Sequence, residues 1–231
     1  MNLKQLNLLA KNYLKNNSSS QREELIRRLK GVHFQNLLLE ILGNSEDLQS
    51  LAKTAYKHDN GFVKLMLVDE RPDYAIRLHI WPPKIMEDSA IHNHPWDLSG
   101  VILLGQYTWV LYQEKEMGHR LKLYECQYLS DYSGHSFNYI KDVYMTEILK
   151  FDMRKYCIYD SKKYLYHKII KNNEEYAVTL MICGAVEGNM AHVITDTDKN
   201  AEIVIKNGCL SVDVVKSYLL KILEEIRNSD Y

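Results

Sequence analysis

Apolar residues recur at helical spacing through residues 1–55 of the chain. In the stretch LKQLNLLAKNYL, residues 3–14, the leucines fall near one face of a helix. The stretch NSSSQREELIRRL, residues 17–29, has serines followed by Gln-Arg-Glu-Glu, which is typical of a helix N-terminus. FQNLLLEIL (34–42) and SEDLQSLAKTAY (45–56) continue the pattern. We therefore predict a helical layer that covers one side of the main domain.

From residue 61 onward the chain changes to short runs rich in β-branched and aromatic residues. These runs lie at residues 61–68, 74–81, 99–113, 121–129, 156–160, 166–170 and 176–184. No helical pattern alternates with them, so they predict an all-β sandwich or barrel rather than a parallel sheet. The last segment, residues 211–229, returns to helical spacing and predicts a helix packed against the barrel or against a partner.

These patterns divide the chain into three parts, which we expect to form one compact domain. Residues 1–58 are the N-terminal helical segment, residues 59–195 the β-barrel domain, and residues 196–231 a C-terminal strand and helix extension. The segment 130–155 is longer than a tight turn, and we expect a strand pair or a lid over the site there.

Composition narrows the class of protein. The 231 residues carry 29 Lys and Arg against 30 Asp and Glu, a balance that argues against a nucleic-acid or membrane-surface partner. No apolar run reaches the roughly 20 residues of a membrane span, and the start lacks the features of a signal peptide. The 4 cysteines are scattered without a CxxC pair, so we expect a cytoplasmic protein.

The candidate chemistry begins with the stretch IHNHPWDLSGVILLGQY, residues 91–107, which contains His92 and His94. On a strand, residues two apart point to the same face and lie about 6.6 Å apart. Both imidazoles can therefore reach one metal ion at about 2.1 Å, with Asn93 facing away. Imidazole ligands suit iron, zinc, copper and nickel rather than magnesium or calcium.

The segment HNHPWDLSGVILLG resembles the first motif of the cupins, a double-stranded β-helix or jelly-roll family in which an HxH pair binds a metal. Cupins usually add a glutamate a few residues later, where this chain has Leu98 or Ser99. The absence of this glutamate resembles the thiol dioxygenase branch, the cysteine and cysteamine dioxygenases, whose iron is held by three histidines. The resemblance implies a mainly β, cupin-type fold and Fe(II), with Zn, Ni or Mn as alternatives.

The third ligand is expected from a distant strand. His167, in YLYHKIIKNNEEYAVTLMI, is similar to the second cupin motif and to the segment HRV…EPAVSL of cysteine dioxygenase. His79 in RLHIW and His135 in SGHSF are the alternative third ligands.

The chain also departs from the thiol dioxygenase pattern. In the mammalian type, a cysteine after the HxH motif is crosslinked to a tyrosine of the late strand, and the corresponding places resemble Ser99 and Cys183. The late strand TLMIC supplies Thr179 and Met181 where that branch has Ser and His. Lys64 in FVKLMLV takes the place of the arginine that grips the substrate carboxylate, and a lysine is a point charge rather than a bidentate fork.

Further candidates come from strand alternation. In YAIRLHIW, Arg77, His79 and Trp81 share one face, so Arg77 could fix an anionic group while Trp81 walls the pocket. Tyr107 or Tyr166 could offer a hydroxyl to a bound oxygen species. Asp97 and Thr179 are the candidates for orienting the ligand histidines from behind.

Together these features predict a mononuclear non-haem Fe(II) oxygenase that acts with O2 on a small substrate, thiol-bearing or amino-acid-like. The alternatives are a non-oxidative metal-dependent cupin, such as an isomerase, lyase or hydrolase, and a ligand-binding module. The partners we expect are the small-molecule substrate and O2, with no nucleic acid and no membrane. A homodimer is an open alternative to a monomer.

Overall fold

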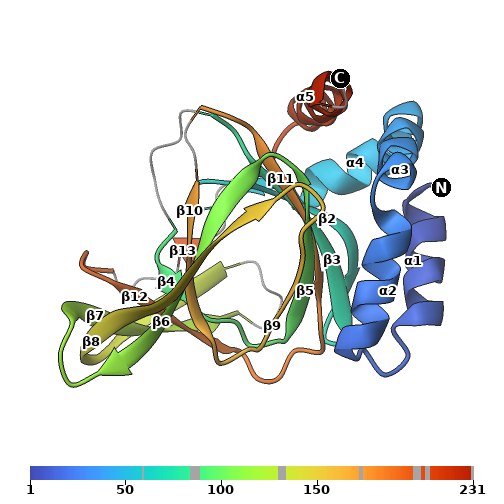
Figure 1. Cartoon of the computed structure of the whole chain (residues 1–231). Helices are drawn as coiled ribbons and strands as arrows, with labels where there is room; N and C mark the ends of the chain where they lie inside the picture. Colours follow the sequence, from blue (N-terminus) through green and yellow to red (C-terminus); the bar gives the residue numbers. More distant parts are fainter. Residues whose placement is uncertain are drawn as a thin grey trace.

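The helical layer begins where the sequence provides helix caps. In the computed structural model, which describes residues 1–58, 60–83, 89–129, 134–171, 174–199, 204–205 and 209–229, Asn2 and Ser18 each form a capping box with the glutamine three residues later. The four helices of this layer are α1 (Leu3–Tyr13), α2 (Ser19–Leu29), α3 (Val32–Gly43) and α4 (Ser45–Thr54). They lie together against one side of a β-sheet (Figure 1).

The sheet beneath these helices is antiparallel and has the strand order β1-β2-β3-β11-β5-β9. Its strands are β1 (Tyr56–Lys57), β2 (Val63–Glu70), β3 (Tyr74–Trp81), β11 (Ala177–Cys183), β5 (Leu98–Leu104) and β9 (Ile158–Ser161). All residues of β3, β5 and β11 are buried, so this sheet is covered on both faces.

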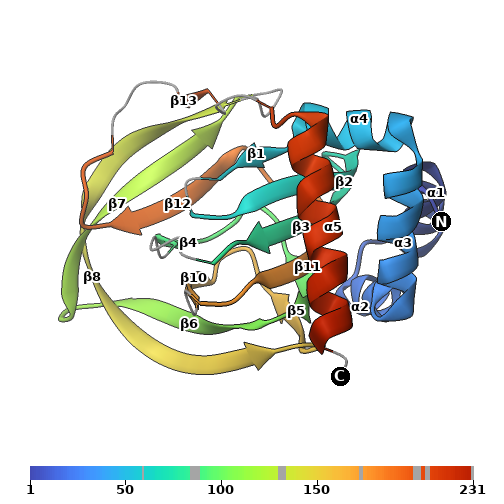
Figure 2. The same cartoon turned by 90° about the horizontal axis from the view of Figure 1, so that it is seen from above.

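A second antiparallel sheet has the order β13-β8-β6-β10-β4-β12-β7. It contains β13 (Val204–Ile205), β8 (Gly134–Arg154), β6 (Gln106–Lys115), β10 (Tyr166–Lys171), β4 (Ile91–His92), β12 (Met190–Thr195) and β7 (His119–Tyr128). The two sheets face each other across an interior space (Figures 1 and 2). The predicted double-stranded β-helix with flanking helices is therefore the observed architecture.

The segment for which the sequence predicted a strand pair or a lid is different. Residues 134–154 form the single long strand β8, whose first half pairs with β7 and whose second half pairs with β6. Both β6 and β7 run antiparallel to β8. Residues 116–118 between them form a bend and not a hairpin, so β7 continues along β8 in the direction of β6. Residues 130–133 lie outside the described part of the chain.

The main hydrophobic core lies between the helices and the first sheet. Ile76, Leu78 and Ile80 of β3 all face it, together with leucines and isoleucines of α1 to α4. The C-terminal helix α5 (Val212–Ser229) contributes Leu219 and Ile222 to the same core. It packs mainly on α4 and α3, beside the helical layer rather than on the second sheet (Figure 2).

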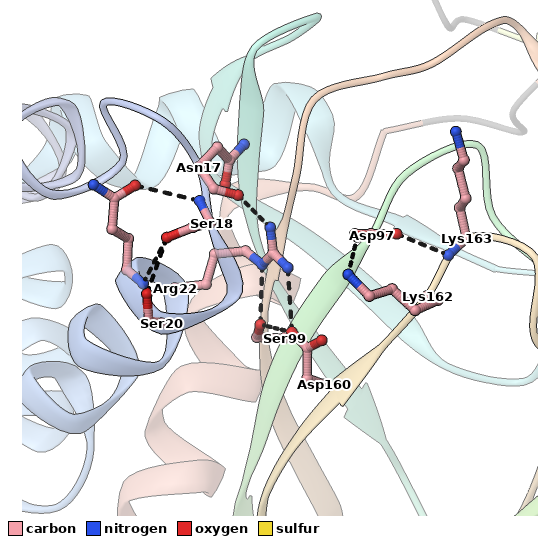
Figure 3. A network of polar contacts seen from close by, with 10 residues as sticks. Asn17, Ser18, Ser20, Arg22, Asp97, Ser99, Asp160, Lys162 and Lys163 are labelled. Carbon is pink, nitrogen blue, oxygen red and sulfur yellow. Dashed lines mark hydrogen bonds and ion pairs between the residues drawn. The ribbon is translucent and has the colours of Figure 1, made fainter.

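A buried arginine joins the helical layer to the first sheet. Arg22 of α2 is 2% exposed and donates to Ser99 Oγ at 3.0 Å and to Asp160 Oδ1 at 3.2 Å (Figure 3). Ser99 in turn donates to Asp160 at 2.5 Å. These bonds satisfy the buried charge and fix α2 across β5 and β9. Within the described residues, no helix is long and apolar enough to cross a membrane.

Candidate metal centre and cavity

Three histidines meet in the second sheet. His92 ends β4 and lies directly opposite His167 of β10 in the antiparallel register, and His94 follows two residues later. Their ligand-capable nitrogens all lie within 4.8 Å of one another. The ring centroids are 4.4 Å apart for His92 and His167, 4.9 Å for His92 and His94, and 5.2 Å for His94 and His167. This geometry forms a cluster that could hold a metal ion.

Backbone hydrogen bonds fix which nitrogen two of these rings offer. The Nδ1 of His92 is 2.8 Å from the carbonyl oxygen of Ala90, and the Nδ1 of His167 is 3.2 Å from that of Leu165. A carbonyl oxygen can only accept, so each Nδ1 carries the proton. The Nε2 atom of each ring therefore keeps a free lone pair, which is the form that binds metals.

Electrostatics favour neutral imidazoles at all three positions. Burial lowers the pKa of His92. Burial lowers the pKa of His94 and of His167 well below its usual value, with a further contribution from the neighbouring histidines. Neutral rings with converging lone pairs are a suitable donor set for a first-row transition metal. The residues present therefore fit the metal that the sequence motif implies.

Tryptophan rings hold two of the imidazoles in place. The Trp109 ring stacks on His167 with centroids 4.3 Å apart, and the Trp96 ring stacks on His94 at 5.6 Å. Both indoles are nearly fully buried. The ring planes of these two histidines are therefore restricted before any ion binds.

The backbone around the HxH motif is fixed by its neighbours. Asn93 faces away from the cluster and accepts a hydrogen bond from the backbone N–H of His192 at 2.7 Å. The backbone N–H of His94 donates to the carbonyl oxygen of Lys163 at 3.3 Å. These contacts attach the motif to β12 on one side and to the loop before β10 on the other.

Asp97 has a different role from the one predicted. Its two carboxylate oxygens accept from Lys163 N at 3.0 Å and from Lys162 Nζ at 2.7 Å (Figure 3), and neither binds a ligand histidine. Asp97 does not orient a ligand histidine by a direct hydrogen bond, because Lys162 and Lys163 occupy its two carboxylate oxygens. Asp97 still supports the site at one remove, since it fixes the loop whose Lys163 carbonyl binds His94.

The histidine cluster opens into a cavity of about 770 Å³ between the two sheets. Five residues singled out in the sequence line it: Lys64, Arg77, Trp81, Tyr107 and Thr179. His79 and His135, the alternative third ligands, also line the cavity, but the three-histidine group found among the described residues contains neither.

Two of the predicted substrate contacts have partners within the wall. Lys64 Nζ donates to the Tyr56 hydroxyl at 3.1 Å. Tyr107 is hydrogen-bonded to Tyr159, and burial raises the pKa of both phenols. The Tyr107 hydroxyl is therefore bound to a second tyrosine and is not free to contact a ligand.

Tyr159 of β9 is a cavity residue that the sequence analysis missed. Its ring lies 5.0 Å from the Trp109 centroid and passes over Gly100 of β5, where any Cβ atom would overlap it. A glycine within an aliphatic strand often marks a close approach of this kind, so Gly100 was the available signal.

The side-chain directions along β5 contradict the predicted correspondence between Ser99 and the crosslinked cysteine of the mammalian enzymes. Ser99 points to the helical layer, where it binds Arg22 and Asp160, and Gly100 stands on the cavity side. Side chains alternate along a strand, so Ser99 and the cavity residues cannot share a face.

Comparisons with known proteins find only distant structural similarity. The chain matches no protein-family model, and no curated protein matches it in sequence. Among solved structures, a cupin-like protein from Thermotoga maritima has 13% identity over 62% of this chain and 86% of its own, with a TM-score of 0.37. A double-stranded β-helix protein from Klebsiella pneumoniae has 11% identity over 63% of this chain and 95% of its own, with a TM-score of 0.36.

A hydroquinone 1,2-dioxygenase from a Sphingomonas species is similar at 11% identity, over 52% of this chain and 65% of its own, with a TM-score of 0.29. Similarity at this level does not transfer an activity, so the chemistry must be derived from the side chains of this chain.

Proposed function

We propose that the chain is a mononuclear metal-dependent oxygenase, which binds Fe(II) through His92, His94 and His167 and oxidises a small organic molecule with O2. The observation that carries this proposal is the convergence of three imidazoles, with no carboxylate among them, on one point of the cavity. Fe(II) bound there would supply electrons for dioxygen activation and open positions at which two reactants meet.

The chain's own residues would tune that centre through charge. Three neutral imidazoles do not reduce the charge of a divalent ion, whereas a carboxylate ligand would. The site would therefore favour substrates that bind through an anionic atom. The stacked Trp96 and Trp109 rings would keep the imidazoles oriented while the other positions exchange.

The cavity wall favours oxygen chemistry over hydrolysis or elimination. All three tryptophans of the chain, Trp81, Trp96 and Trp109, line it and are buried. Asp196, which is exposed, is the single acid among the described lining residues. A lyase or isomerase that uses a carboxylate base beside the metal is disfavoured, because no carboxylate lies there in the part of the cavity that the structure describes.

The narrower thiol dioxygenase assignment is a version of this proposal. Lys64 lines the cavity where that branch has its carboxylate-binding arginine, which supports an amino-acid-like thiol. Ser99 and Gly100 do not provide the cavity-facing cysteine of the mammalian enzymes. An oxygenase of this kind would act without the crosslink.

The test is metal content together with oxygen consumption. Protein produced in iron-rich medium is expected to contain close to one iron per chain. It should consume O2 with cysteine, cysteamine or an acid of the class inferred below. His92→Ala should lose both properties, and His33→Ala, at an exposed position of α3, should keep them.

Two results would contradict the proposal. One is turnover at full rate without O2. The other is a zinc-substituted protein as active as the iron form, which would indicate Lewis-acid rather than redox chemistry.

A further inference from the structure

A positively charged side chain lies buried in the cavity wall without an ion pair to any carboxylate that the structure describes. Arg77 of β3 is 4% exposed, and its Nε has no hydrogen-bond partner. Its cross-strand neighbours are Met66 on β2 and Met181 on β11. The guanidinium carbon lies 4.4 Å from the centroid of the Trp96 ring. Among the described residues, no carboxylate forms an ion pair with it.

A buried charge without a counter-ion destabilises a folded protein. A cation–π contact offsets only part of that cost. Such a charge is expected where a bound anion completes the site. The pKa of the nearby His79 is held well below its usual value by burial and by the charges of Lys64 and Arg77, so this histidine adds no further positive charge.

The sign of the whole cavity agrees with an anionic occupant. Arg77 and Lys64 lie in its buried wall, and further cations line it at Lys57, Lys168 and Lys199. Arg71 also lines it but is paired with Asp69. Asp196 is the one acid in the described part of the lining. The cavity therefore carries an excess of positive charge before any metal is added.

The size and the surface of the cavity specify the rest of the occupant. A volume of about 770 Å³ falls in the range of sites that take drug-sized ligands of about 300–1,000 Å³, far more than a single amino acid needs. Indole rings from both sheets line it, and an aromatic wall of this kind packs well against a ring system. Trp81 and Trp96 also each have a buried indole N–H without a partner.

Trp96 connects the charged wall to the histidine cluster. Its ring centroid lies 5.6 Å from that of His94 and 4.4 Å from the Arg77 guanidinium carbon. The separation of His94 and Arg77 cannot exceed the sum of these two distances. If the anionic group of a ligand binds Arg77, the rest of the ligand therefore lies within reach of the histidine cluster.

From these observations we propose that the cavity binds a planar organic acid of about the size of a bicyclic aromatic acid, with its anionic group on Arg77. Its ring system would lie against the aromatic wall to which the tryptophan side chains contribute. This inference deepens the proposed function. It rests on that function in one respect, because it identifies the acid as the substrate of the oxygenase. The binding itself requires neither metal nor turnover.

The test is calorimetric titration of the chelator-treated wild-type chain. The probes are 2-naphthoate, indole-3-acetate and phenylacetate, each paired with its neutral amide, and cysteine. At least one bicyclic acid is expected to bind about 20-fold or more tightly than its amide, because a charge-assisted hydrogen bond contributes the difference. That acid should also bind at least tenfold more tightly than cysteine.

Two substitutions and one control assign the effect to Arg77. Arg77→Met should abolish the preference for the acid and leave the affinity for the amide within about threefold, and Arg77→Lys should retain part of the preference. Arg27→Gln removes an arginine from an exposed ion pair on α2 and should leave every affinity unchanged. Thermal unfolding of each variant checks that it is folded.

The outcomes are decisive in both directions. Equal affinities for acids and amides would overturn the inference, as would an acid preference that persists in Arg77→Met, or a tighter complex with cysteine. The result also separates from the oxygenase proposal, because the acid titration uses the metal-free protein, whereas the oxygenase test measures iron content and O2 uptake. Acid binding without iron or O2 uptake would leave the binding site established and the oxygenase proposal refuted.

Discussion

His92 on β4 and His167 on β10 face each other as a cross-strand pair, with their ring centroids 4.4 Å apart. Each ring directs its Nδ1 to the carbonyl oxygen of the residue two positions earlier in the chain, Ala90 for His92 and Leu165 for His167. Two segments far apart in sequence thus use the same local contact to present Nε2. The register between β4 and β10 then brings those nitrogens to one point.

Loss of one ring should abolish metal binding. His167→Ala is expected to weaken Fe(II) or Co(II) affinity by at least about 100-fold, because two imidazoles cannot complete the three-ligand site. Equilibrium dialysis with metal analysis gives the measurement. His33→Ala, on the exposed face of α3, is the matched control and should bind as the wild type does. Retention of full affinity by His167→Ala would show that the cluster is not the metal site.

The metal-free chain should lose stability as the pH falls below about 6.5, the usual histidine value. Burial and the charges of Lys64 and Arg77 hold the pKa of His79 well below that value in the folded state. The unfolded chain therefore takes up the proton first, and each such histidine lowers the free energy of unfolding by up to about 1.4 kcal/mol per pH unit. The loss stops once the pH falls below the folded-state pKa.

Urea unfolding at pH 7 and pH 5 measures this effect. His79→Phe, whose ring can stack on Phe62 as the imidazole does at 4.2 Å, should show a smaller difference between the two pH values than the wild type. An equal difference in both proteins would mean that His79 titrates normally in the folded state. His33→Phe serves as the exposed comparison.

Removing the buried charge of Arg77 should stabilise the protein. Arg77→Met places an apolar side chain between Met66 and Met181 and is expected to raise the free energy of unfolding by roughly 1–2 kcal/mol. A residue that lowers the stability of the folded protein is expected to be retained only where function requires it. Chemical denaturation without ligand provides the measurement, and a destabilised variant would indicate that Arg77 has a structural role.

Arg22 should behave in the opposite way, although it is also a buried arginine. Arg22→Met removes a partner of both Ser99 and Asp160 and is expected to lower the free energy of unfolding by about 3 kcal/mol, because Asp160 loses its counter-ion and keeps only its bond from the Ser99 hydroxyl. Arg27→Met, on the same helix and in an exposed pair with Glu23, should change stability by less than about 0.5 kcal/mol. Similar losses in the two variants would contradict this account of the network.

Local patterns account for the parts of the fold that the sequence predicted. The Ser18 cap, the leucine spacing of α1 and the alternation in YAIRLHIW each depend on neighbours within a few residues. The long strand β8 was not predicted as one element, because its alternation is broken by exposed Ile140, Ile148 and Leu149. Strand β12 was also missed, and its pairing with β7 and β4 is a long-range property.

The sequence by itself determined that His92 and His94 share a direction and that Arg77, His79 and Trp81 share another, since side-chain direction along a strand has a fixed period of two. Only the tertiary structure decided which third histidine joins the pair and which faces meet across the cavity. It also directed Asp97 to Lys162 and Lys163, and placed Tyr159 over Gly100. These relationships depend on strand register and sheet packing, which arise from contacts between residues far apart in the chain and leave no periodic signal in it.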